Sequence, residues 1–333
     1  MSLRIIKPGI STTLQDAGRP GFQAAGVPVS GAMDRDSMKL ANLLCGNDPG
    51  KVVLETTLHG AEWLVEEEQL IAFSGGGAAL LVNNQPAPYN RAIRVKACSL
   101  ISLKPIQTGC RSYLAVAGGF KAMTDLNSHS TYSPAGLGGY QGRALKAGDL
   151  LEWSSKKSML TAAIMDSLAN EGNDFTVAKW GIDFSLQNQG KEKSIRVFKG
   201  PESEWFDEHT RTKLFRESFG VSNQSNRMGY RLSGPALILS GKRELISTAV
   251  CAGTIQVTHE GSLVVLMADA QTTGGYPRLA MVAAVDLPAC AQLRPGDSIQ
   301  FREISMDKAE ELYLEKEKLF RQIQASVAVK FHT

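Results

Sequence analysis

Asp16 and Arg19 are the first residues of this 333-residue chain whose types and spacing suggest chemistry, in the stretch LQDAGRPGF. They lie three residues apart, and the neighbouring glycines let the backbone fold tightly around them. One interpretation is a turn whose aspartate accepts backbone amides and whose arginine closes a local salt bridge. The other is a binding or catalytic site that uses both charges. The sequence favours the turn and leaves the site open.

A second charged stretch is SNRMGYRLSG, in which Arg227 and Arg231 flank Tyr230. On a strand, positions 227, 229 and 231 would share one face. Two arginines on one face of a barrel core need carboxylate or phosphate partners, because an unpaired buried guanidinium is costly. These arginines either form internal ion pairs, with Asp269 or Asp286, or bind a carboxylate or phosphoryl group of a ligand.

A third candidate is the Gly-rich loop NSHSTYSPAGLGGYQGRALKAGD, which contains Ser128, Ser130, Thr131 and Arg143. Hydroxyls beside glycines can form a nest for an anion. The alternative is a long ordered loop without a ligand. The adjacency of Ser128 and His129 does not indicate a catalytic dyad, because neighbours on a strand point apart.

The fourth candidate is QTTGGYP, which follows the apolar run LVVLMADA. An earlier apolar run, QLIAF, is followed by SGGG in the same way, so we interpret Gly274 and Gly275 as a turn that both places share. Only the later place adds polar side chains, which we predict to form a substrate-facing edge. These added residues are Gln271, Thr272, Thr273 and Tyr276.

The elements that must position these residues come from an internal repeat. Four segments recur in the same order, and each pair alone is weak. The pairs are LRIIKPG with IRVFKGP, GRPGF with NRMGY, LETTLHGAEWLV with ISTAVCAGTIQV, and LKAGDLLEW with LRPGDSIQF. The chain is therefore predicted to contain two copies of one fold.

Each copy is made of short segments rich in Val, Ile, Leu and aromatic residues, which predicts β-strands. Many short strands with few helices indicate a mainly β protein with a closed or nearly closed antiparallel barrel in each copy. The first copy is longer by about 16 residues, GAMDRDSMKLANLLCGN, which predict a helix, and by about 44 residues around the Gly-rich loop.

We therefore expect a first barrel domain at 1–155, a connector at 156–192, a second barrel domain at 193–305 and a C-terminal helix with its tail at 306–333. The helix is predicted to be amphipathic and to lie on a barrel. Its predicted apolar positions are Leu312, Leu314, Leu319, Phe320 and Ile323.

The composition narrows the class of function. With 36 basic and 33 acidic residues, the net charge of +3 gives no broad basic field for nucleic acid. No run of about 18 apolar residues is present, so no membrane span is expected. Five scattered cysteines without CxxC spacing fit a reduced, cytoplasmic protein. Five scattered histidines form no HExxH pattern, so no metal site is expected. P-loop, dinucleotide-binding and GxSxG motifs are also missing.

Taken together, the motifs resemble the KipA / allophanate hydrolase subunit 2 family, which is biotin-dependent carboxyltransferase-like. The motifs are TLQDAGRPGF, SGAMDRDSMKLAN, LETTLHG, SYLAVAGGF, the SxST loop with its downstream GR, SNRMGYRLSG, QTTGGYP and LRPGDSIQF. They cover nearly the whole chain. The resemblance implies paired cyclophilin-like β-barrels, in agreement with the repeat. Asn127 stands where many relatives have a turn glycine, and asparagine tolerates the left-handed conformation.

Family members of this length imply a subunit of ATP-dependent 5-oxoprolinase, a hydrolase that acts on a cyclic amide. Such a subunit works with a smaller KipI-like subunit to activate 5-oxoproline by phosphorylation, and a LamB/YcsF-like subunit then opens the ring to L-glutamate. The implied cofactor is ATP with Mg²⁺, at a site shared with the partner subunit. The chain has no AMKM-type biotinylation motif, so no biotin is expected on it.

The resemblance also implies where the site lies. It assigns catalysis to Arg227, Arg231, Gln271, Thr272 and Thr273. It assigns substrate binding to Gln15, Asp16, Arg19, Ser128, Ser130, Thr131, Arg143, Tyr230, Gly274, Gly275 and Tyr276. Two alternatives within the family are a carboxyltransferase component that acts on a urea-like amide, and a regulator that binds and antagonises a histidine-kinase inhibitor.

Overall fold

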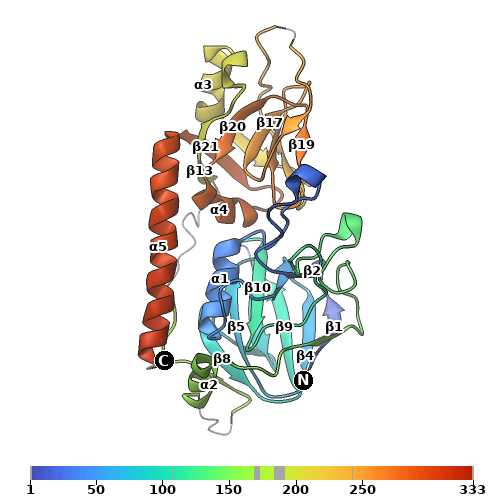
Figure 1. Cartoon of the computed structure of the whole chain (residues 1–333), viewed down its shortest axis with the longest axis vertical. Coiled ribbons are helices and arrows are strands. Elements are labelled where there is room, and N and C mark those ends of the chain that lie inside the picture. Colours follow the sequence, from blue (N-terminus) through green and yellow to red (C-terminus); the bar gives the residue numbers. More distant parts are fainter. Residues whose placement is uncertain (1, 107, 169–172, 184–191, 242, 332–333) are drawn as a thin grey trace. The chain divides into compact units, whose positions relative to one another are not determined.

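The computed structural model describes residues 2–106, 108–168, 173–183, 192–241 and 243–331. The chain forms two compact units (Figure 1). The first unit comprises residues 1–19, 34–185 and 319–333, and the second comprises 20–33 and 186–318. These limits differ from the expected domains in three places. Residues 20–33 group with the second unit, the described part of the 156–192 connector belongs mostly to the first, and the C-terminal helix is divided between the two.

The first unit is built from two antiparallel sheets, each six-stranded among the described residues. One sheet has the order β11-β1-β4-β9-β6-β7 and the other β12-β8-β5-β10-β3-β2. The strands are β1 Ser2–Pro8, β2 Ser11–Gln15, β3 Val53–Thr57, β4 Ala61–Val65, β5 Gln69–Gly75, β6 Ala78–Val82, β7 Gln85–Pro86, β8 Ala92–Val95, β9 Ser99–Pro105, β10 Arg111–Val116, β11 Leu150–Glu152 and β12 Phe175–Val177.

The core of the first unit lies between these sheets. Alternate residues of β4 point inward, and Trp63 and Val65 pack there with Phe73 and Leu114 of the other sheet. The mainly β prediction is confirmed. The expected single barrel is replaced by two facing sheets, and β12, from the predicted connector, pairs with β8 at one edge of the second sheet.

The predicted helical insertion is confirmed as α1, Arg35–Leu44, which packs on β5 and β10. Asp34 caps its N-terminus by accepting hydrogen bonds from the Ser37 amide at 2.9 Å and the Ser37 hydroxyl at 2.7 Å. The Asp34 amide in turn donates to the Tyr113 hydroxyl at 2.7 Å, and that hydroxyl donates to Glu55. Burial raises the pKa of Tyr113 well above its usual value, with Glu55 and Asp34 adding to the shift, so Tyr113 remains a donor.

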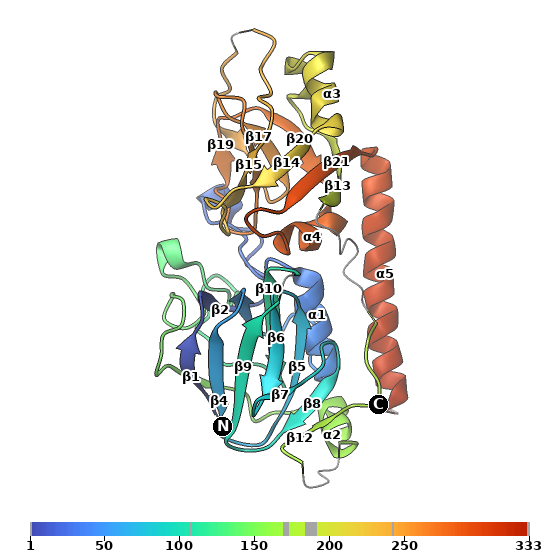
Figure 2. The same cartoon turned by 180° about the vertical axis from the view of Figure 1, so that it is seen from behind.

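The second unit contains a closed barrel with the order β13-β20-β17-β18-β15-β14-β21, which is best seen in Figure 2. Its strands are β13 Glu192–Lys199, β14 Ser218–Val221, β15 Gly229–Ser233, β17 Thr254–Val257, β18 Leu263–Leu266, β20 Arg278–Val282 and β21 Ser298–Glu303. A separate two-stranded ladder joins β16 Thr248–Ala249 to β19 Thr273–Gly274.

The repeat is visible in the structure, although the two copies pair their strands differently. Its LKAGD and LRPGD turns match closely, since Asp149 accepts from the Lys146 amide at 2.7 Å and Asp297 from the Arg294 amide at 2.9 Å. The strand after the first turn, β11, pairs antiparallel with β1, whereas β21 pairs parallel with β13. The second barrel is therefore not wholly antiparallel as predicted.

The remaining helices are α2 Met159–Asp166, α3 Glu208–Arg216, α4 Leu287–Ala291 and α5 Met306–Lys330. The C-terminal helix α5 was predicted, but its apolar face is partly different. Phe320 is buried against Leu40 and Leu43 of the first unit, whereas Leu314 and Leu319 are exposed. Within the described residues, no helix combines the length and apolarity that a membrane crossing requires.

The cap of α1 gives a stability prediction. Replacing Asp34 with alanine removes the acceptor for the Ser37 amide, so the free energy of unfolding should fall by about 1–2 kcal/mol in chemical denaturation. Asp34→Asn keeps a capping oxygen and should lose less. Asp207→Ala, at the cap of α3, is the matched control for a cap whose own carboxylate is exposed. An unchanged denaturation midpoint for Asp34→Ala would contradict the stabilising role of the Asp34 cap.

Candidate functional site

The carboxylate of Asp16, just after β2, lies at the centre of a buried hydrogen-bond network in the first unit. Its Oδ1 accepts from the Gly18 amide at 2.8 Å and from Ser128 Oγ at 2.7 Å, and its Oδ2 accepts from the His129 amide at 2.6 Å. Ser130 Oγ also donates to Oδ1 and accepts from the Asp16 amide at 3.1 Å. Asp16 is 7% exposed, and these donors compensate for its burial.

The donors come from a loop that folds back on itself by a tight turn. Asp125 and Ser128 exchange backbone hydrogen bonds at 2.9 and 3.2 Å. Leu126 and Asn127 between them both have positive φ, 52° and 60°, as a two-residue hairpin turn requires. The expectation that Asn127 adopts the left-handed conformation is confirmed. Asp125 also accepts from the Gly138 amide at 2.7 Å, which closes the loop.

Arg19 is fully buried beneath this loop, and its guanidinium donates to the Ser130 carbonyl. The chain passes so close above that only glycine fits. A Cβ added at Gly138 would lie 2.2 Å from the Ser130 carbonyl oxygen, and one at Gly139 would lie 1.9 Å from Thr131 Oγ1. The Gly-rich sequence therefore serves close packing over Arg19.

Gln15 and Thr131 fasten the same loop to β2. The Gln15 amide group donates to Thr13 Oγ1 at 3.0 Å and to the Thr131 carbonyl at 3.2 Å. Thr131 Oγ1 donates to the Leu14 carbonyl at 2.9 Å. Six predicted residues thus meet in one network, and each helps to hold the loop. They are Gln15, Asp16, Arg19, Ser128, Ser130 and Thr131.

A cavity of about 360 Å³ opens beside this network, and His129 forms part of its wall. The residues that matter for its chemistry are Asp48, Lys51, Gly118, Gly119, Phe120 and His129. Because the His129 amide is bound to Asp16, the network fixes the position of this wall. Sequence reasoning missed Asp48 and Lys51. The signal was available in the motif SYLAVAGGF, because Gly118 and Gly119 line the same cavity and a Cβ at Gly119 would lie 3.4 Å from the Lys51 side chain.

The imidazole of His129 is held through its Nδ1 atom. Its Nδ1 lies 3.2 Å from the Ala122 carbonyl and 3.0 Å from Thr124 Oγ1. A carbonyl oxygen can only accept, so a hydrogen bond to Ala122 requires a hydrogen on Nδ1 and leaves Nε2 as the acceptor of the neutral ring. An imidazole held in this way can accept or donate a proton at Nε2. The ammonium of Lys51 supplies a positive charge at the same cavity.

Arg143, predicted to bind substrate, is engaged in an ion pair. Its guanidinium binds both carboxylate oxygens of Asp149, at 2.7 and 2.9 Å, and lies over the ring of Tyr140. The hydrogen bonds to Arg143 lower the pKa of Asp149, and those to Asp149 raise the pKa of Arg143. This pair braces the LKAGD turn, so Arg143 has a structural task that the sequence did not indicate.

In the second unit, Arg227 confirms the internal ion-pair interpretation. Its guanidinium binds Asp269 through two bonds, at 2.7 and 3.0 Å, and also donates to the Gly31 carbonyl at 2.7 Å. Asp286, the other predicted partner, instead binds Arg196. Arg227 therefore attaches the 20–33 segment to the barrel of this unit.

The predicted shared face of Arg227 and Arg231 is wrong. β15 begins at Gly229, so Arg227 precedes the strand and the alternation of faces does not extend to it. Arg231 points to the exposed side of the barrel. Tyr230, predicted to bind substrate, is 3% exposed and packs in the apolar core of the second unit.

The QTTGGYP stretch is an exposed edge. Thr273 and Gly274 form β19, and the side chains of Gln271, Thr273 and Tyr276 are exposed, whereas Thr272 is half-buried. The interpretation of its glycines as a turn is wrong, because Gly274 lies in β19 and Gly275 directly follows that strand; neither has the positive φ of Gly75 and Gly77. A Cβ added at Gly274 would lie 2.6 Å from Gln256 Nε2, so a larger residue there would displace the Gln256 side chain.

The Arg143–Asp149 pair gives a prediction with a pH dependence. The lowered pKa of Asp149 stabilises the fold at neutral pH, and this contribution is lost as pH falls through the folded-state pKa. Arg143→Gln should therefore lower the free energy of unfolding by about 1 kcal/mol at pH 7 and by less in acid. Asp149→Asn and the double variant complete the cycle. Fully additive losses in denaturation measurements would contradict a direct interaction.

Comparison with known proteins now places the chain in a family. A family model described as carboxyltransferase domain, subdomain A and B, matches residues 25–303. The chain is 37% identical to the 5-oxoprolinase C subunit of Escherichia coli, covering 96% of this chain and 97% of that one. The corresponding protein of Haemophilus influenzae is 31% identical, with 96% of each chain covered.

A solved structure of similar fold is the urea amidolyase of K. lactis, with a TM-score of 0.83 and 30% identity. The match covers 97% of this chain and 20% of the urea amidolyase, so the chain spans about one fifth of that enzyme. The family resemblance of the sequence motifs is confirmed: this chain belongs to the carboxyltransferase subdomain A and B family, together with the 5-oxoprolinase C subunits.

Proposed function

We propose that this chain is the C subunit of an ATP-dependent 5-oxoprolinase. The supporting observation is correspondence over the whole length, since relatives named as 5-oxoprolinase C subunits match it nearly end to end. The proposal includes a KipI-like partner, with which this chain activates 5-oxoproline. A LamB/YcsF-like partner then opens the ring to L-glutamate, all three in the cytoplasm.

The cavity beside His129 fits such a substrate in size and charge. 5-Oxoproline has about nine non-hydrogen atoms, and about 360 Å³ is the share of roughly twelve water molecules in the liquid. In the proposed binding mode, the Lys51 ammonium pairs with the substrate carboxylate. His129 Nε2 faces the amide group and exchanges a proton with it, while Asp16 holds the histidine in place.

ATP would supply the phosphoryl group that makes the lactam carbon a better target for water. The described residues contain no group of three His, Cys, Asp or Glu side chains able to hold a metal ion. Mg²⁺ usually binds through substrate phosphates and one or two carboxylates. We therefore assign the nucleotide and its Mg²⁺ to a site shared with the KipI-like subunit.

The predicted residues of the second unit keep a narrower role in this proposal. Arg231, Gln271, Thr273 and Tyr276 are exposed and available to a ligand or a partner subunit. Thr272 is held by the ladder, where its carbonyl accepts from the Val250 amide at 3.0 Å. Arg227, Tyr230, Gly274 and Gly275 shape the surface that presents them.

A urea-type carboxyltransferase remains the second candidate, favoured by the similarity in fold to urea amidolyase. It would require a biotin carboxylase and a biotin carrier as further proteins. The third candidate, a regulator that binds a histidine-kinase inhibitor, would need partner binding but no turnover. Arg231→Ala and Gln271→Ala separate the enzyme role from the regulator role. If turnover falls while complex formation persists, the chain acts as part of an enzyme.

Reconstitution tests the proposal. The purified chain, mixed with the KipI-like and LamB/YcsF-like proteins of the same genome, should release L-glutamate and ADP from 5-oxoproline and ATP. Release should require every component. Turnover that persists without this chain, or that needs urea and bicarbonate in place of 5-oxoproline, would overturn the assignment.

Variants in the first unit test the proposed cavity within that reaction. His129→Gln should lower kcat about a hundredfold, the size expected for a lost proton-transfer group. Asp16→Asn should lower kcat about tenfold by displacing His129. Asp149→Asn is the matched control, because this carboxylate also accepts a backbone amide but lies outside the cavity wall. Equal losses for Asp16→Asn and Asp149→Asn would exclude a specific role for Asp16.

A further inference from the structure

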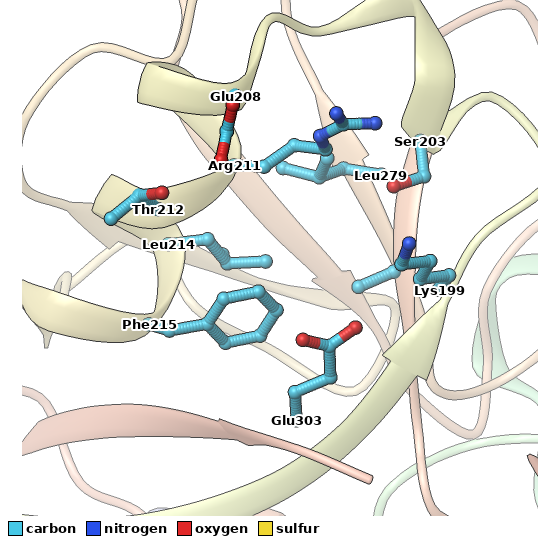
Figure 3. A pocket seen from close by; sticks show the side chains of 10 residues that line it. Lys199, Ser203, Glu208, Arg211, Thr212, Leu214, Phe215, Leu279 and Glu303 are labelled. Atoms are coloured by element: carbon cyan, nitrogen blue, oxygen red, sulfur yellow. The ribbon is translucent and has the colours of Figure 1, made fainter. Parts of the chain in front are cut away.

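A second cavity, of about 270 Å³, lies in the second unit, between α3 and the ends of β13, β20 and β21 (Figure 3). It belongs wholly to residues 186–318 and shares no residue with the cavity beside His129. Nothing in the proposed 5-oxoprolinase reaction uses it.

One wall of this cavity is apolar. Leu214 of α3 and Leu279 and Ala280 of β20 are at most 2% exposed and belong to the barrel core. The ring of Phe215 continues this wall and lies beside Leu214 in Figure 3. The wall offers contact to a short aliphatic side chain, and its burial would favour binding.

Two cationic side chains and a hydroxyl group lie on one side of the cavity. The Arg211 guanidinium, the Lys199 ammonium and the Ser203 hydroxyl lie there together (Figure 3). Glu204 pairs with Arg211 Nη1 and lies 3.7 Å from Lys199 Nζ, and within the described residues the other donors of the Arg211 guanidinium have no hydrogen-bond partner. Ser203 is only 4% exposed, and within the described residues its hydroxyl has no hydrogen-bond partner.

Negative charge approaches from the other side. The Glu303 carboxylate, at the end of β21, points into the cavity below the ring of Phe215 and Lys199 (Figure 3). Glu303 forms no ion pair or side-chain hydrogen bond with the residues described. Glu208, at the start of α3, adds a second carboxylate, on the Arg211 side of the cavity (Figure 3). The cavity therefore presents cations and an anion on opposite sides of an apolar surface.

We propose that this cavity binds an aliphatic α-amino acid of about the size of leucine. The ligand carboxylate would bind Arg211, Lys199 and the Ser203 hydroxyl, as a guanidinium with further donors favours. Its ammonium would bind Glu303, and its side chain would cover Leu214 and Phe215. The volume of about 270 Å³ equals the share of about nine water molecules, close to the nine or so non-hydrogen atoms of leucine. A second ligand carboxylate is disfavoured, because Glu208 lies on the rim and Glu204 pairs with Arg211.

Calorimetric titration of the full chain with L-leucine tests this proposal. Saturable binding of one leucine per chain is expected. 4-Methylpentanoate, which lacks the ammonium, and 3-methylbutylamine, which lacks the carboxylate, should each bind at least tenfold more weakly. Absence of saturable leucine binding, or binding of either analogue as tight as that of leucine, would overturn the proposal.

Variants locate the binding within the cavity. Glu303→Gln and Arg211→Gln should each weaken leucine binding at least tenfold, and Ser203→Ala should weaken it less. Glu260→Gln is the matched control, an exposed glutamate of the same unit outside the cavity. Circular dichroism verifies that each variant is folded. Leucine binding that survives both Glu303→Gln and Arg211→Gln would place the ligand elsewhere and contradict the assignment.

Because leucine binding does not depend on 5-oxoproline turnover, the absence of leucine binding would leave the proposed enzyme function intact.

Discussion

The need to satisfy one buried carboxylate governs the first unit. Asp16 follows an edge strand and is shielded from water, so its oxygens require donors. Those donors come from Ser128, His129 and Ser130, more than a hundred residues away in sequence. The same interaction fixes the loop, sets the close contact over Arg19 that admits only glycine, and places His129 on the wall of a cavity. The turn expected from the sequence is therefore also the structure that holds His129 at the wall of the proposed site.

In the second unit, an ion pair attaches an early segment of the chain to a closed barrel. Its barrel closes through the parallel contact of β13 with β21, which leaves no free edge in that sheet. The Arg227–Asp269 pair then ties the early 20–33 segment to this barrel through the Gly31 carbonyl. The arginine thereby holds together parts of one unit that are nearly 200 residues apart in sequence.

Most of the strands and helices could be predicted from the sequence, because they follow from local sequence patterns. The repeat located strands in both copies, and the helices α1 and α5 followed from apolar periodicity. The network around Asp16 was partly predictable, since its members sit in Gly-rich motifs. Other features depend on long-range geometry. The exposure of Arg231 and the burial of Tyr230 depend on which face of β15 is turned to the core, and a shift of one residue reverses every face. Lys51 and Asp48 meet His129 only in the folded chain.

The central claim is that this chain helps to activate a lactam by phosphorylation of its carbonyl oxygen. The most direct measurement follows that atom. 5-Oxoproline labelled with oxygen-18 at the lactam carbonyl is converted by the complete three-subunit enzyme, and the released phosphate is analysed by phosphorus NMR. The account predicts that the label appears in inorganic phosphate. Phosphate free of label, with all of the label retained in glutamate, would contradict it.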